Sequence, residues 1–184
     1  ILQENKAFNI ELSSSKINGL VIKPNEVFSF WKLVGKVNKK NGYKEGRVII
    51  NNKVEAGMGG GLCNLANTIN LLILHSPLKI TEVHFHSDAL ASDIGKRVPL
   101  ANGTSVAYNY VDYRFKNTTD QSFQISLNCE NQELVAILNS ESPIPYKYKI
   151  VEENHRFVEE NGIYYRKSKI YRVTEDKETS IELN

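Results

Sequence analysis

One cysteine, Cys63, lies two residues after a glycine-rich run in which four of the chain's 11 glycines fall between positions 57 and 61. We predict that this run feeds a helix with Cys63 in its first turn, because glycines leave backbone N–H groups unobstructed. Free amides and the positive end of a helix dipole favour a thiolate, and the same amides could hold an oxyanion. The pattern indicates a cysteine nucleophile for acyl transfer or, equally well, a structural turn with a buried thiol.

A second group with chemical potential alternates along Glu82, His84 and His86. On a strand these three side chains share one face, and Val83 and Phe85 face the core. One histidine could take the proton of Cys63, with Glu82 or the other histidine orienting it. Alternatively, Cys63, His84 and His86 could ligate zinc, or the strand could carry solvated histidines without a function.

The elements that position these residues follow from the periodicity. Residues 5–17 and 62–75 have apolar residues at helical spacing, and residues 80–86, 105–115, 123–129 and 134–138 read as strands. We expect the strand at residues 123–129 to bury Cys129 as a small apolar residue. The expected fold is α+β, with N-terminal and central helices packed on a mostly antiparallel sheet.

A short segment with two prolines, Ser142-Pro143-Ile144-Pro145, marks the best boundary in the chain. We therefore divide the sequence into a domain of residues 1–141 and a linker with a β-rich extension, residues 142–184. Asn161-Gly162 lies between two apolar runs of this extension and predicts a small C-terminal β-hairpin.

Composition excludes several classes of protein. The 184 residues carry 23 Lys and Arg against 21 Asp and Glu, a net charge of +2, which argues against nucleic-acid binding by phosphate neutralisation. The hydrophobic content of 41% excludes global disorder. Residues 69–74 are too short an apolar run to span a bilayer. The chain starts at Ile1 and shows no signal peptide, so we expect any targeting information to lie upstream.

Several motifs together resemble the VanW family over about residues 5–138. They are Asn25-Glu26-Val27-Phe28-Ser29-Phe30, Gly42-Tyr43, Gly59-Gly60-Gly61-Leu62-Cys63, Glu82-x-His84-x-His86-Ser87, Thr104-Ser105-Val106, Asp112 and Phe115-Lys116-Asn117. The chain departs from the usual family pattern at Asn64, Val83 and Gly103, where Gln, Arg and Asp are common.

This resemblance implies an association with glycopeptide resistance and an L,D-transpeptidase-like acyl transfer on peptidoglycan stem peptides. Cys63 would be the nucleophile and His84 or His86 the base, with Glu82 orienting it. Substrate binding would fall to Gly59, Gly60, Gly61, Leu62 and Asn64. No cofactor is expected, with zinc as the alternative. The alternative functions are a zinc-binding hydrolase or metal-stabilised domain that uses Cys63, His84 and His86, and a module that binds peptidoglycan precursors without catalysis. The expected location is the extracytoplasmic face of the cell envelope for a cross-linking enzyme, with the cytoplasm as the alternative. The resemblance says nothing about the oligomeric state.

Overall fold

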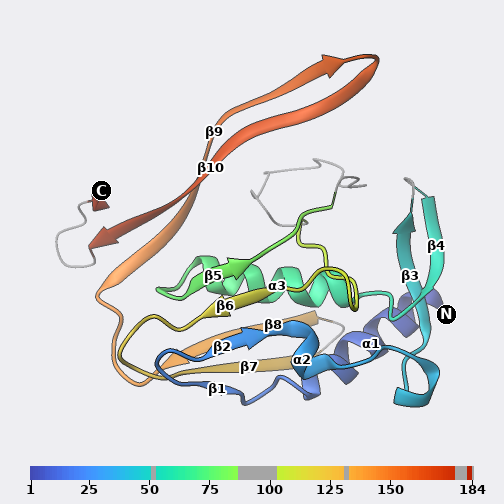
Figure 1. The fold of residues 1–184 in the computed structure, drawn as a ribbon, viewed down its shortest axis with the longest axis horizontal. Helices are drawn as coiled ribbons and strands as arrows, with labels where there is room; N and C mark the ends of the chain where they lie inside the picture. Colours follow the sequence, from blue (N-terminus) through green and yellow to red (C-terminus); the bar gives the residue numbers. More distant parts are fainter. Residues whose placement is uncertain (51–52, 87–102, 131–132, 177–181, 184) are drawn as a thin grey trace.

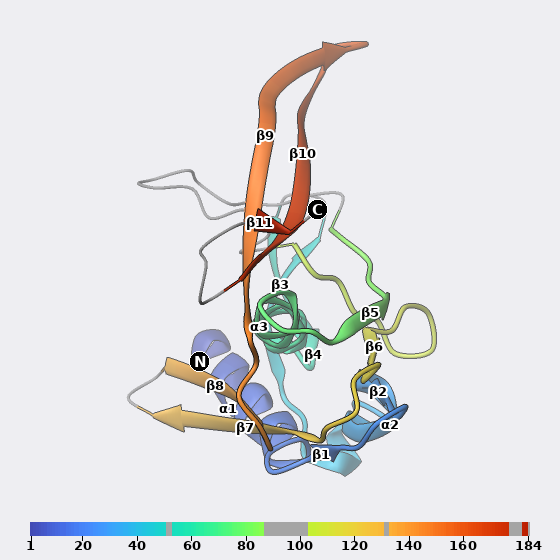
Figure 2. The ribbon, with the colours of Figure 1, turned by 90° about the vertical axis from the view of Figure 1, so that its left-hand side faces the viewer.

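Helix α3, Leu62–Leu74, lies at the centre of the molecule and contacts α1, β5, β8 and β9 (Figures 1 and 2). Its apolar stripe is buried as predicted, at Leu62, Leu65, Ala66, Ile69 and Ile73. Because apolar residues continue around much of its circumference, the helix can be covered on several sides at once.

The computed structural model describes residues 1–50, 53–86, 103–130, 133–176 and 182–183. The remaining elements are α1 Leu2–Ser15, β1 Val21–Ile22, β2 Val27–Ser29, α2 Phe30–Val34, the 3-10 helix η1 Lys39–Asn41, β3 Glu45–Ile50, β4 Lys53–Met58, β5 Lys79–Glu82, β6 Arg114–Lys116, β7 Phe123–Glu130, β8 Glu133–Ser140, β9 Tyr146–Glu160, β10 Ile163–Asp176 and β11 Glu182–Leu183.

All described strand pairs are antiparallel, which confirms the predicted α+β class. The strands form three three-stranded sheets, in the orders β1-β7-β8, β2-β6-β5 and β11-β10-β9, and the two-stranded hairpin β3-β4. Strand β7 alternates between buried and exposed side chains, as expected for a strand with one face on the core. Cys129 lies beyond the buried part of β7 and is exposed, so the prediction of a buried thiol there is wrong.

Aromatic side chains join β2 to β6 within the core. Phe28 stacks on Phe115 with ring centroids 4.6 Å apart, and Tyr113 packs edge-on against Phe28. All three side chains are buried. Such ring pairs add about 0.5–1.5 kcal/mol beyond their burial, so they fix the position of β6 firmly.

Two predicted strands are shorter than expected. The strand expected over residues 80–86 ends at Glu82, after which a single bridge pairs Phe85 with Thr104. Phe85 was predicted to face the core, but it is 53% exposed. Val83 packs against the core, as predicted. The strand expected over residues 105–115 reduces to Arg114–Lys116, because a turn at residues 108–110 interrupts the extended chain.

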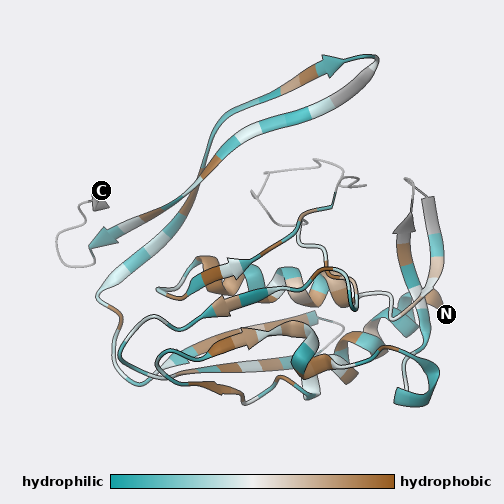
Figure 3. Cartoon of the chain, in the orientation of Figure 1, coloured by the Kyte–Doolittle hydropathy of each residue, from teal (hydrophilic) through white to brown (hydrophobic). Residues whose placement is uncertain are grey.

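The predicted C-terminal hairpin is confirmed and is much longer than the sequence indicated. Strands β9 and β10 pair from Tyr146 to Asp176 and project away from the rest of the molecule (Figures 1 and 2). Most of the hairpin is hydrophilic, in contrast to the apolar residues around α3 (Figure 3). Arg172 anchors its base by donating to the carbonyls of Ser76 and Leu78 at 3.1 and 3.0 Å. The domain boundary at residue 142 stays a prediction.

Among the described residues, no helix has the length and apolar character needed to cross a membrane.

The glycine run before α3 packs directly against the backbone of β3. A Cβ at Gly60 would lie 2.5 Å from the carbonyl carbon of Gly46 and 2.8 Å from the carbonyl oxygen of Arg47. Asn9 of α1 secures the same junction, since its amide donates to the carbonyls of Lys44 and Gly60 at 2.9 and 3.1 Å. Only glycine therefore fits position 60.

We expect Gly60→Ala to lower the free energy of unfolding by about 3 kcal/mol, because neither backbone segment can move away cheaply. Urea denaturation would measure the loss. Gly19→Ala is the matched control: open space surrounds Gly19, so its φ of +80° costs only the left-handed strain of about 1–2 kcal/mol. A loss at Gly60 no larger than at Gly19 would contradict the packing argument.

Candidate functional site

Cys63 occupies the first turn of α3, as predicted. Gly61 caps the helix with a φ of +108°, and the Cys63 side chain is half-buried. Its thiol donates to the carbonyl of Val106 at 3.6 Å. In the described part of the chain, no hydrogen bond joins Cys63 to a histidine.

The protonation state of Cys63 differs from the sequence prediction. Burial raises the pKa of the Cys63 thiol, and contacts with the backbone of Val106 and of Cys63 itself do not offset this effect. Burial of Cys63 therefore favours the protonated thiol over the thiolate. A nucleophilic Cys63 would need a base to take its proton.

Three amides in and just after the glycine run donate to backbone carbonyls within the fold. The N–H of Gly59 donates to Lys44, that of Gly60 to Gly57 and that of Leu62 to Gly59, at 3.0, 3.2 and 3.4 Å. Of the predicted substrate-binding residues, Gly59, Gly60 and Leu62 are buried, Gly61 is half-buried and Asn64 is exposed.

Residues 103–106 connect the cysteine to the histidine segment. The N–H of Ser105 donates to the carbonyl of His84 at 2.7 Å, and that of His86 to Gly103 at 2.9 Å. Asn67 of α3 holds the same residues, because its Oδ1 accepts from the amide and hydroxyl of Thr104 at 3.0 and 2.9 Å. Cys63 and the two histidines thus contact one short segment. Ser87, which completes the motif, lies outside the described residues.

The structure distinguishes the two histidines. The Nε2 of His84 lies 3.2 Å from Glu82 Oε1, so these two side chains share a face as predicted. His86 is exposed, and no side-chain partner for it is found among the described residues. A carboxylate that orients one ring nitrogen is the usual support of a catalytic imidazole, and His84 has this support.

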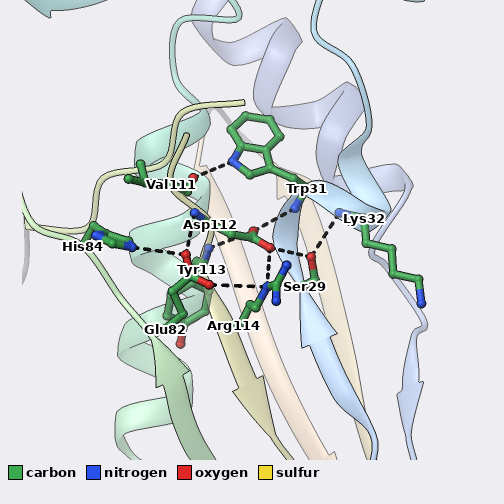
Figure 4. A network of polar contacts seen from close by, with 9 residues as sticks. All are labelled: Ser29, Trp31, Lys32, Glu82, His84, Val111, Asp112, Tyr113 and Arg114. Atoms are coloured by element: carbon green, nitrogen blue, oxygen red, sulfur yellow. Dashed lines mark hydrogen bonds and ion pairs between the residues drawn. The ribbon is translucent and has the colours of Figure 1, made fainter. Parts of the chain in front are cut away.

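Asp112 is the centre of a polar network beside this pair (Figure 4). Its Oδ1 accepts from the amides of Trp31 and Tyr113 at 3.1 and 2.8 Å, and its Oδ2 accepts from Ser29 Oγ and Arg114 Nε at 2.5 and 2.8 Å. Burial alone would raise the pKa of Asp112, but these hydrogen bonds outweigh it and lower the pKa below its usual value. Asp112 is therefore a carboxylate at any ordinary pH.

The network joins that of Glu82 and borders an open cleft of about 690 Å³. Glu82 Oε1 accepts the amide of Asp112 at 3.0 Å, and Oε2 lies 3.5 Å from Arg114 Nε. The cleft is lined by the turn at residues 108–111 and by Val27, Ser29, Trp31, Lys32, Glu82, Asp112 and Arg114. Cys63 and His84 are not among its lining residues.

Cys63, His84 and His86 do not converge as zinc ligands. Across the residues that the structure describes, no three His, Cys, Asp or Glu side chains gather closely enough to hold a metal ion.

The sequence did not single out Ser29, Arg114 or the cleft as parts of a site. Asp112 and Ser29 enter the sequence analysis only as positions of the family pattern. The one available signal was the coincidence of Ser29 and Asp112 with family motifs.

Comparisons with known proteins give one family. The family model described as "VanW like protein" matches residues 5–138. The chain is 31% identical over 180 residues to Vancomycin B-type resistance protein VanW of Enterococcus faecalis, covering 94% of this chain and 63% of that protein. It is 28% identical over 141 residues to Uncharacterized protein YoaR of Bacillus subtilis, covering 77% of this chain and 45% of that protein. The chain thus spans less than two thirds of the length of both relatives. No solved structure matches it.

Alkylation should report the raised pKa of Cys63. In a Cys129→Ser variant, we expect the rate of reaction with iodoacetamide to rise with pH to a midpoint above that of the same protein unfolded in urea, because burial disfavours the thiolate. Mass spectrometry of the alkylated product measures the rate at each pH. A midpoint below that of the unfolded protein would show an activated thiolate instead.

Asp112→Asn should lower the free energy of unfolding at pH 7 by about 2–3 kcal/mol, the scale of hydrogen bonds to a charged group. Since the folded pKa of Asp112 is lowered, its stabilisation is present above the unfolded pKa and lost as the pH falls through the folded pKa. Between pH 7 and pH 2, the free energy of unfolding should therefore fall less for the variant than for the parent. Urea titrations from pH 2 to pH 7 measure this, with exposed Asp120→Asn as the control. Parallel pH curves for Asp112→Asn and parent would contradict the assignment.

Proposed function

The chain belongs to the VanW family, and we propose from this that it takes part in glycopeptide resistance as a cysteine acyl-transfer enzyme acting on peptidoglycan stem peptides. The association with resistance is supported by the relative from Enterococcus faecalis, whose name is Vancomycin B-type resistance protein VanW. The proposed site of action is the extracytoplasmic face of the cell envelope, where cross-links form.

A single observation carries the catalytic proposal. Residues 103–106 hold the Cys63 thiol at one point and pair with the His84–His86 segment at another. A thiol in the first turn of a helix, an imidazole and an orienting carboxylate are the parts that cysteine acyl transfer requires.

Each group has a defined role in the proposed reaction. Cys63 Sγ attacks the carbonyl carbon before the terminal residue of the stem, and its proton passes to the imidazole. The C–N bond then breaks, and the imidazolium returns the proton to the departing amine, which leaves a thioester. An amine of a neighbouring stem attacks the thioester carbonyl and loses its proton to the imidazole. The C–S bond then breaks, and the imidazolium returns the proton to Sγ, which restores the thiol and the neutral base.

His84 is the proposed base, because Glu82 orients its ring and no such partner supports His86 within the described residues. The raised pKa of Cys63 fits a mechanism in which the base acts when substrate is bound, rather than a standing thiolate. Catalytic hydrogen bonds often tighten only in the substrate complex, so thiol and imidazole would close on each other there. The proposed oxyanion donor is the amide of Cys63 in the first turn of α3.

A second candidate function is binding of peptidoglycan precursors without catalysis. The observation that favours it is the bond of the Cys63 thiol to a backbone carbonyl rather than to an imidazole. Such a protein would hold the stem peptide and leave it intact.

Intact-mass spectrometry after incubation with a disaccharide tetrapeptide tests the proposal. In the parent we expect a mass increase equal to the mass of the substrate minus the mass of the released terminal amino acid, and in Cys63→Ala we expect none. His84→Gln should slow acylation by about 10²–10⁴-fold, the usual contribution of a general base. His86→Gln, two residues away, is the matched control and should change the rate little.

Three results would count against this assignment. An adduct that persists in Cys63→Ala would remove the nucleophile, and an equal loss in the two histidine variants would remove the special role of His84. Binding of the substrate without any adduct would favour the precursor-binding function.

A further inference from the structure

The open cleft beside Asp112 contains two carboxylates whose oxygen atoms are already engaged. Asp112 accepts four hydrogen bonds through its two oxygens. Glu82 accepts from the amide of Asp112 and from His84, and its other oxygen faces Arg114 Nε. These carboxylates have little capacity left for a ligand, so they act as supports of the cleft.

The cationic groups of the same cleft are available. Both carboxylates contact Arg114 through Nε, so this contact fixes the guanidinium while its two terminal NH₂ groups make no hydrogen bond within the described residues (Figure 4). The Arg114 side chain is 50% exposed. Lys32 also lines the cleft, and its ammonium has no partner among the described residues. The cleft thus offers donors and positive charge.

Aromatic groups line another part of the same cleft. Trp31 is held by a hydrogen bond from its Nε1 to the carbonyl of Val111 at 2.8 Å, and its ring meets Tyr108 edge-on with centroids 5.5 Å apart. Tyr110, on the same turn, is 88% exposed. An apolar wall next to a few oriented polar groups is typical of a small-ligand site.

We infer that this cleft binds the free terminal carboxylate of a peptide, with the two terminal NH₂ groups of Arg114 forming a bidentate pair. A planar guanidinium matches a carboxylate in this way better than an ammonium does. Lys32 adds charge, and Trp31 and Tyr108 pack against the residue before the carboxylate.

The identity of the peptide rests on the proposed function, which makes it a stem peptide. The two sites are close along the chain, since Val106 contacts Cys63 and Tyr108 lines the cleft. Val106 and Tyr108 are two residues apart, so their Cα atoms lie within about 7 Å of each other.

Calorimetric titration of the Cys63→Ala protein tests this inference without turnover. We expect a stem tetrapeptide with a free terminal carboxylate to bind at least tenfold more tightly than the same peptide with a terminal amide. Arg114→Gln should abolish this preference, and Arg114→Lys should reduce it because it keeps the charge without the fork. Lys79→Gln, an exposed change on β5 outside the cleft, should preserve it. Circular dichroism confirms that each variant is folded.

Each outcome decides the matter. Equal affinity for acid and amide, or a preference unchanged in folded Arg114→Lys and Arg114→Gln, would overturn the inference. Inorganic phosphate that displaces the peptide acid at equal concentration would also overturn it, because the cleft would then be a general anion site.

Carboxylate-selective binding without an acyl-enzyme in the parent would refute the proposed catalysis alone. An acyl-enzyme in the parent without carboxylate selectivity would refute this inference alone.

Discussion

The close approach of two backbone segments at Gly60 and Gly46 is the constraint on which the site depends. A Cβ at position 60 would enter the carbonyl group of Gly46, and one at position 46 would lie 3.1 Å from the carbonyl oxygen of Gly60. This contact sets the N-terminus of α3 against β3, and the Asn9 amide fastens both to α1. The glycines that suggested an oxyanion site are therefore needed first for packing.

This packing has a direct chemical consequence. It brings Cys63 into a half-buried position where its thiol stays protonated, because a buried thiolate loses its hydration. A nucleophile in such a place depends on a base supplied by another part of the fold. The Glu82–His84 pair, which lies on a segment hydrogen-bonded to residues 103–106, is the group that fits this requirement.

Residues 103–112 link the parts of the molecule that carry function. Asn67 fixes their beginning to α3, and Asp112 fixes their end to β2 and α2 through Ser29 and the amide of Trp31. Between these anchors the chain passes the Cys63 thiol and then lines the cleft. Because the anchors are buried or part-buried hydrogen bonds, which are costly to break, they hold this irregular segment without a strand ladder.

The sequence by itself determined the local elements and the family. The apolar stripe from Leu62 to Ile73 required a buried helix, and Asn161-Gly162 between alternating residues required a hairpin, since both signals depend only on neighbours in the chain. Tertiary structure decided the rest. Ser29, Glu82 and Arg114 come together from three different strands, and the exposure of Phe85 and the protonated state of Cys63 depend on what packs against them. Periodicity carries no record of such distant contacts, so only the folded chain could reveal them.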